Sequence, residues 1–414
     1  METMKPLLFR FSLVLLLSFF LCSSCGVKYP KKKIDTSDIA IEHNNRGVMY
    51  LKQNDLERAE WEFMTAAEIG AKYPDPHNNL GLVYKYKGDY NKAIEAFQRA
   101  IKIDKKWAAP YNHMGATYLD KGDIGKAMEK IKYAITLDKK FAEAYYNLGL
   151  CYLERGRYRS KDGKISPEDL SKAAQQIKKA TNIDVRLHHG HLKLGDIYRD
   201  LGDWENAIVR YRVAIETDPT NPIPWGRLGA LYYKKGDFQK AESSFARALA
   251  LNPTEEYHLQ LGEAFLQQGF FEEAFAQFQI AAQKNPYNGL AFFNMAYTLE
   301  KMHHYEEAVM GYKKALDINP HFTDAAFNMG MVYITTKNPS SAARAFKKAL
   351  AIDPNHLKSL YNLGTIYNDT GYPDRANEYL CRFIKMGQGE DTSYPVELEI
   401  ARKITKQNGG CGGF

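Results

Sequence analysis

Residues 79–90 read NLGLVYKYKGDY, and the Leu-Gly pair near the start of this stretch recurs through the chain. The pairs Leu80-Gly81, Met114-Gly115 and Leu148-Gly149 lie 34 residues apart, each with a Tyr three residues after its Gly. A period of this length predicts an array, because one unit cannot bury its apolar face alone and stacks on its neighbours. Later in the chain, Leu194-Gly195 and Leu228-Gly229 are also 34 residues apart, and so are Met329-Gly330 and Leu363-Gly364.

Each unit contains two apolar patterns of helical spacing with a break between them. In the second unit we predict a first helix over about 76–86 and a second over about 91–103. Gly88 lies between them and can take the left-handed conformation that ends a helix. The second helix presents small and aromatic residues on one face, which lets the two helices approach closely: Ala93, Phe97 and Ala100.

The later units repeat a trio of Ala, aromatic and Ala in the second helix and close on a Pro. This pattern resembles the tetratricopeptide repeat. The resemblance implies an all-α fold, a right-handed superhelical solenoid of about ten helix hairpins over residues 40–390. The trios are Ala207-Tyr211-Ala214, Ala241-Phe245-Ala248, Ala274-Phe278-Ala281, Ala308-Tyr312-Ala315 and Ala342-Phe346-Ala349, and the closing prolines are Pro219, Pro253, Pro286, Pro320 and Pro354.

Several units depart from the pattern. The first four lack the closing Pro, Ala296 replaces the Gly of the eighth, and Leu380 and Phe383 replace an aromatic and a small residue in the tenth. The fourth unit is 12 residues too long, with the surplus at about 155–168. We expect a surface loop there, either a basic docking loop or a tolerated insertion. After the tenth unit we expect a capping helix over 391–407, as solenoid ends require, and a flexible tail over 408–414.

The N-terminus has the pattern of a targeting segment. Lys5 and Arg10 precede an apolar run over 11–21 that is shorter than the roughly 20 residues of a membrane-spanning helix, and fits a signal peptide. The following Cys22-Ser23-Ser24-Cys25 resembles the bacterial lipobox. The resemblance implies a signal peptide over 1–24, a lipid on Cys25, a tether over 25–39 and attachment to the outer membrane, facing the periplasm. A plain secretory signal is the alternative.

The other cysteines of the mature chain have no metal-like spacing. Cys151 follows the repeat Gly149 by two residues, where small buried residues recur, so we expect it in the core. Cys411 lies in a glycine-rich tail. It is either a free thiol or the partner in an intermolecular disulfide, which could form in an oxidising compartment.

In the tetratricopeptide family the first helices line the concave groove of the solenoid. Carried over to this chain, the sixth position of the repeat holds Asn in six units, namely Asn45, Asn79, Asn147, Asn294, Asn328 and Asn362, and the fifth holds Asn44, Asn78 and Asn112 in the first three. Asn has both donors and acceptors, so such a row could bind the backbone of an extended peptide. A common structural role of Asn at this position is the alternative.

Later in the chain the same face is apolar. Aromatic and Met side chains exposed in a groove are typical hot spots for a helix or an apolar peptide, whereas buried ones belong to the core. Both interpretations are open for Phe293, Tyr297, Phe327, Met331, Ile334 and Tyr361.

No catalytic motif is present in the sequence. His188-His189-Gly190-His191 has no acidic or Cys partner at ligand spacing, and His43, His77, His191 and His258 fall where the family has a bulky packing residue. A net charge of +7 over 414 residues is too dilute to indicate nucleic acid. We expect a non-enzyme with no cofactor, metal or small-molecule substrate.

These features together favour a scaffold that binds envelope proteins or peptides. The lipid signal, the short tether and the opening unit from Gly47 to Ala59 loosely resemble pilotins of type IV pili, which implies a role in assembling a pilus or a secretin. The alternative is a peptide-binding adaptor for a cell-wall hydrolase or a glycosyltransferase.

Overall fold

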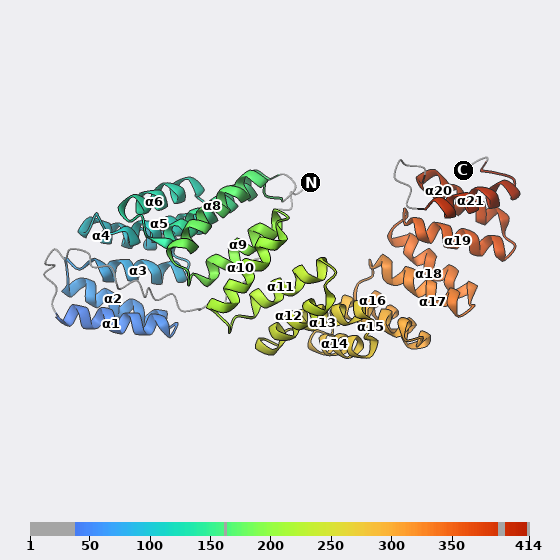
Figure 1. The fold of residues 1–414 in the computed structure, drawn as a ribbon, viewed down its shortest axis with the longest axis horizontal. Helices are drawn as coiled ribbons and strands as arrows, with labels where there is room; N and C mark the ends of the chain where they lie inside the picture. Colours follow the sequence, from blue (N-terminus) through green and yellow to red (C-terminus); the bar gives the residue numbers. More distant parts are fainter. Residues whose placement is uncertain (1–37, 161–163, 388–393, 412–414) are drawn as a thin grey trace. The chain divides into compact units, whose positions relative to one another are not determined.

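The computed structural model in Figure 1 describes residues 38–160, 164–387 and 394–411. All regular structure in these ranges is helical, which confirms the all-α fold. The signal peptide, Cys25 and nearly all of the tether lie outside the described residues. No helix in the described ranges is long and apolar enough to cross a membrane.

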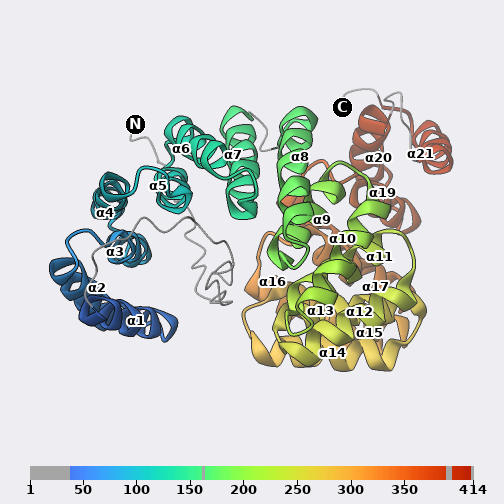
Figure 2. The same cartoon turned by 60° about the vertical axis from the view of Figure 1, so that its left-hand side comes forward.

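The chain divides into two compact units, and the boundary in the sequence falls between Asp203 and Trp204. The helices of the first unit are α1 Asp38–Lys52, α2 Leu56–Ile69, α3 Pro74–Tyr86, α4 Tyr90–Ile103, α5 Ala108–Asp120, α6 Ile124–Leu137, α7 Ala142–Arg159, α8 Pro167–Ile183 and α9 His188–Asp200. In Figure 2 the helices α1 to α7 follow one another in chain order, and each odd-numbered helix packs on the next as a hairpin.

The second unit continues the same pairing from α11 onward. Its helices are α10 Trp204–Thr217, α11 Pro222–Lys234, α12 Phe238–Leu251, α13 Glu255–Gln268, α14 Phe271–Lys284, α15 Gly289–Lys301, α16 Tyr305–Ile318, α17 Thr323–Thr335, α18 Pro339–Ile352, α19 Leu357–Asp369, α20 Pro373–Gly387 and α21 Pro395–Gln407.

A close approach between the two helices explains the repeated Gly. A Cβ on Gly81 would lie 2.4 Å from the buried Phe97 ring, so only Gly fits beneath that ring. In the eighth repeat the two sides exchange roles. Ala296 supplies the methyl group, and Gly311 on the second helix leaves room for it, because a Cβ there would lie 2.8 Å from the Ala296 Cβ. The departure at Ala296 is therefore compensated within the hairpin.

In four hairpins an Asp caps the second helix, namely Asp55, Asp89, Asp123 and Asp237. Asp89 accepts a hydrogen bond from the backbone N–H of Lys92, which caps α4, and Gly88 before it has a φ of +81°. A cation three residues after the capping Asp lies over the Tyr of the first helix in four hairpins. These pairs are Arg58 over Tyr50, Lys92 over Tyr84, Lys126 over Tyr118 and Lys240 over Tyr232.

The first repeat is adapted to be the beginning of the array. Where later repeats place a Leu or Met that packs on the preceding hairpin, it has Arg46. The Arg46 Nε donates to the buried Glu62 carboxylate at 3.3 Å, and the His43 Nδ1 donates to the same carboxylate at 2.6 Å. A charged group in this place keeps the end of the described stack polar, and the Arg46 side chain is 41% exposed.

The predicted capping helix is present as α21, and it packs on α20. Leu398 and Ala401 of α21 are buried in one core with Phe383 and Leu380. Leu380 fills the space over Gly364, and Phe383 contacts Tyr394 just before α21, with ring centroids 6.2 Å apart. The two unusual residues of the tenth repeat thus prepare a surface for the capping helix. Ile400, on the other side of α21 from Leu398, is 39% exposed.

The segment after α21 is fastened to α20. Cys381 and Cys411 form a disulfide with Cα atoms 5.8 Å apart, and the Asn377 amide donates to the carbonyl oxygens of Asn408 and Gly410 at 3.0 Å each. Cys411 is thus paired within the chain and not between chains. Residues 408–411, which we expected to be flexible, are held in place. Cys151 is fully buried, and burial raises the pKa of its thiol to about 12.

The extra residues of the fourth repeat mostly lengthen two helices instead of forming a loop. Helix α7 has 18 residues and α8 has 17, against 13 to 15 elsewhere. The Arg155 Nη2 donates to Asp169 Oδ1 at 2.6 Å, and Ser166 caps α8. Burial raises the pKa of Asp169, but hydrogen bonds and charge from Arg155 outweigh it, so that the pKa is lowered. Arg155 is therefore committed to the fold. Residues 161–163, with Lys161, lie outside the described residues.

Candidate protein-binding surface

The two predicted Asn rows join each other in the first unit. The Asn79 Nδ2 donates to Asn44 Oδ1 at 2.9 Å, and the Asn147 Nδ2 donates to Asn112 Oδ1 at 3.0 Å. Between these links, the His113 Nδ1 donates to Asn78 Oδ1 at 2.8 Å. Each link connects the first helices of consecutive repeats, so we call these six side chains the amide ladder.

The amide ladder links consecutive repeats, and some of its amide hydrogens remain available for a ligand. Asn79 and Asn147 are half-buried, and each spends one of its two amide hydrogens on the link, which leaves the other for a ligand. Burial and the nearby Lys85 lower the pKa of His113 to about 3. The ring is therefore neutral near pH 7. Asn45, at the start of the row, is exposed.

In the second unit the Asn side chains have separate partners. The buried Asn294 lies 3.5 Å from the Glu263 carboxylate, a group whose pKa is raised by burial. Asn328 interacts with the Tyr312 hydroxyl, and Asn362 donates to the Lys358 carbonyl of its own helix at 2.8 Å. The row predicted from the sequence therefore does not continue as one ladder.

Three of the six predicted apolar residues pack against rings of the same unit. Phe293 lies 4.7 Å from Phe322 between ring centroids, Phe327 lies 5.2 Å from His356, and Tyr361 lies 5.4 Å from Phe383. All three are half-buried, so each ring both stabilises the stacking and shows an edge to solvent.

More accessible apolar groups lie beside these rings on α15 and α17, two helices in contact with each other. Leu290 is 43% exposed and Ile334 is 38% exposed, while Tyr297 and Met331 are half-buried. We call these four residues the apolar strip. Leu290 was not among the predicted residues, although its place one and two turns before Phe293 and Tyr297 on the same helix could have indicated it.

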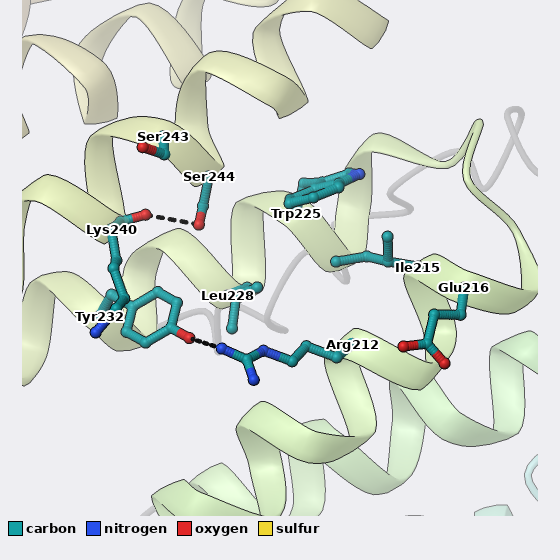
Figure 3. Close-up of a pocket in the computed structure, with 9 residues that line it drawn as sticks. All are labelled: Arg212, Ile215, Glu216, Trp225, Leu228, Tyr232, Lys240, Ser243 and Ser244. Atoms are coloured by element: carbon teal, nitrogen blue, oxygen red, sulfur yellow. Dashed lines mark hydrogen bonds between the residues drawn. The ribbon is translucent and has the colours of Figure 1, made fainter.

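The cavities between second helices were not predicted from the sequence. One of about 340 Å³ lies between α10, α11 and α12, with Trp225, Leu228 and Tyr232 from α11 as its base (Figure 3). The Arg212 guanidinium reaches across it and donates to the Tyr232 hydroxyl at 2.8 Å. A second cavity of about 430 Å³ uses the same repeat positions in α4, α5 and α6. The two cavities thus occupy the same place in their repeats, with Trp225 and Tyr111 at equivalent positions.

The histidines at the fourth repeat position have packing partners. The His258 Nδ1 donates to Gln277 Oε1 at 2.8 Å, and the buried His191 donates to the Val185 carbonyl at 3.1 Å. His189 packs edge-on against Tyr146 with centroids 4.4 Å apart. Within the described ranges, no three His, Cys, Asp or Glu side chains gather as metal ligands would.

Sequence models of the tetratricopeptide repeat match most of the chain. They match residues 74–106, 227–289, 290–322, 323–356 and 357–386, and a model described as TPR repeat matches 115–156 and 195–236. No curated protein sequence matches the chain.

Solved structures share the architecture. The C-terminal part of a TPR repeat-containing protein from Cytophaga hutchinsonii aligns with a TM-score of 0.50 at 18% identity, over 60% of this chain and 98% of that chain. YrrB, described as a TPR protein with an unusual peptide-binding site, has a TM-score of 0.41 at 22% identity, over 45% and 97%. PilF of Pseudomonas aeruginosa has a TM-score of 0.43 at 19% identity, over 51% and 95%. At these identities the likeness concerns the fold alone. With sequence models matching repeat after repeat from residue 74 to residue 386, the chain belongs to the tetratricopeptide repeat family.

Proposed function

We propose that the protein is a non-catalytic scaffold, held in the bacterial envelope by a lipid on Cys25, that binds peptides or proteins for the assembly of an envelope machine such as a type IV pilus or a secretin. The observation that carries the binding role is the apolar strip of Leu290, Tyr297, Met331 and Ile334. Exposed apolar side chains on adjacent first helices suit the apolar face of a helix or the side chains of an extended peptide.

Two observations support a place in the envelope. The first 25 residues have the order of a lipoprotein signal: basic residues, an apolar run and then Cys25. The Cys381–Cys411 bond is of a kind that persists in oxidising compartments and is rare in the cytosol of mesophiles. The pilus role rests on the likeness of the signal, the tether and the opening repeat to pilotins.

Site-specific photo-crosslinking tests the binding role. A photoreactive amino acid at Ile334 should capture an envelope protein in living cells, whereas the same amino acid at Ile400 of the capping helix should not. The two side chains are matched in type and exposure, at 38% and 39%. Ile334→Glu should reduce capture of that protein by an unchanged probe at Leu290, and Ile400→Glu should leave it intact. Equal capture at the two sites would refute the binding role of the apolar strip.

Labelling with palmitate tests the anchor separately. Cys25→Ser should abolish label and release the protein from membranes. Cys22→Leu, which places the usual Leu of the lipobox, should keep both. If the Cys25→Ser protein stays labelled and membrane-bound, the anchor is not at this residue.

A further inference from the structure

A row of exposed cations follows one edge of the first unit. They lie at the carboxyl ends of α4 and α8 and in the turns that follow α4, α6 and α8, places that repeat along the same edge of a stack of hairpins. We call them the basic ridge: Lys102, Lys105, Lys106, Lys139, Lys140, Lys178, Lys179 and Arg186. All eight side chains are exposed, and within the described part of the chain none forms an ion pair.

The carboxylates in these turns accept hydrogen bonds from backbone N–H groups. Asp104 accepts from the N–H of Lys106 at 2.9 Å, Asp138 from that of Lys140 at 2.8 Å, and Asp184 from that of Arg186 at 3.0 Å. Three carboxylates thus stand beside eight cations, and each already has a structural task. The ridge therefore keeps an excess of positive charge facing solvent.

The fold does not require this charge. In the second unit the same five-residue turns are 216–220, 250–254, 283–287, 317–321 and 351–355, and every one has a Pro where the ridge has Lys105 and Lys139. Those five turns together contain one lysine, Lys284. Since the hairpins of both units pack alike, the lysines serve something other than stacking.

We propose that the basic ridge binds the surface of a bilayer that contains anionic lipids. Protein interfaces are depleted in Lys and rely on aromatic and Arg anchors, yet the ridge is seven lysines and one arginine. The aromatic residues next to it, Trp107, Phe141 and Tyr145, are only partly exposed, and Tyr145 lies beneath Lys179. Lysine heads in a row suit lipid headgroups, which attract them by charge without a fixed geometry. Val185, 67% exposed between Asp184 and Arg186, adds an apolar contact for the headgroup region.

The choice of a bilayer as the neighbour rests on the proposed anchor. From Cys25 to the start of α1 there are 13 residues, which reach at most about 45 Å at full extension. A lipid on Cys25 would keep the first unit close to the membrane, so that the ridge meets it at high effective concentration. Bilayer binding by the ridge itself can be measured without the lipid.

Vesicle co-sedimentation with the mature chain, residues 25–414 carrying Cys25→Ser, tests the proposal. The chain should sediment with vesicles of phosphatidylethanolamine and phosphatidylglycerol, less so as salt is raised, and not with phosphatidylcholine alone. K105E/K106E/K139E/K140E should weaken binding at least about 100-fold. The control K313E/K314E/K347E/K348E makes the same change in net charge at exposed lysines of α16 and α18, and should stay within about threefold of the parent.

The outcomes separate the alternatives. Circular dichroism must show that both variants keep the helical content of the parent. Equal losses in the two variants would mean that net charge alone drives binding, which overturns the ridge. Binding to polyglutamate but not to anionic vesicles would mean that the ridge serves an acidic protein, which overturns the bilayer. Either result leaves the anchor to be decided by palmitate labelling and the binding role by crosslinking at Ile334.

Discussion

The hairpin of α15 and α16 should tolerate a methyl group on one helix only. Ala296 occupies the place where the other repeats have Gly, and Gly311 leaves the space that its methyl group needs. We expect Gly311→Ala to destabilise the protein, and we expect the double variant Ala296→Gly, Gly311→Ala to recover much of the loss, because the methyl group then moves from one helix to the other.

The structure gives the magnitude. An Ala at position 311 would bring two Cβ atoms to 2.8 Å and approach the Ala296 Cα to 3.3 Å, and both backbones belong to packed helices. Such overpacking costs about 1–3 kcal/mol, offset by about 1 kcal/mol for Ala over Gly in a helix. Ala296→Gly alone loses that propensity and a buried methyl group, about 2 kcal/mol in all. The double variant removes the clash, so the two effects should couple by about 1–3 kcal/mol.

Urea unfolding of the four proteins measures this coupling, and hydrogen exchange of residues 289–318 shows whether the change is local. Gly125→Ala in α6 is the control, since the nearest group to its new Cβ is the Asp123 carboxylate at 3.8 Å, and it should be neutral or stabilising. Additive single effects, within about 0.5 kcal/mol, would refute the reasoning.

Three further predictions concern charge and the disulfide. Burial lowers the pKa of His113 to about 3, below its unfolded value of 6.5, so protonation favours the unfolded chain. The free energy of unfolding should therefore fall by about 1–2 kcal/mol from pH 6.5 to pH 5. His113→Gln should make this fall smaller when urea unfolding is measured at the two pH values. Arg155→Leu leaves the buried Asp169 carboxylate without its cation and should lower the free energy of unfolding by about 3 kcal/mol. Hydrogen exchange in α7 and α8 should become faster. The double variant Arg155→Leu, Asp169→Leu should recover part of the loss. Cys381→Ser opens a 30-residue link and should cost about 3–4 kcal/mol at the C-terminal cap; unchanged exchange of α21 in this variant would contradict the link.

The hairpins could be predicted from the sequence because their cause is local. The 34-residue step, the small residues opposite rings, and the Gly-Asp turns all lie within one unit, and the predicted 76–86 and 91–103 agree with α3 and α4 to within two residues. The early start of α8 could also have been predicted locally, because Ser166 followed by Pro167 and Glu168 is typical of a helix start. The comparison with a 34-residue period led us to expect a loop there instead.

Contacts between repeats could not be predicted in the same way. Asn79 meets Asn44 rather than solvent because of how α3 is rotated against α1, a rotation that the pattern of either helix alone does not contain. Whether Phe327 belongs to a groove or to a core depends on the same rotation, and the half-buried ring takes part in both. The pairing of Cys381 with Cys411 depends on the direction in which the chain leaves α21.

The redox state of Cys381 and Cys411, beside the capping helix, shows whether a molecule has been exposed to an oxidising compartment. A chain that has met only reducing solvent carries two thiols at Cys381 and Cys411, while Cys151 stays sealed in the interior in either state. Brief alkylation of whole cells, followed by mass spectrometry of the peptide that contains Cys411, would therefore distinguish newly synthesised copies from those that have reached an oxidising space, without any tag on the protein.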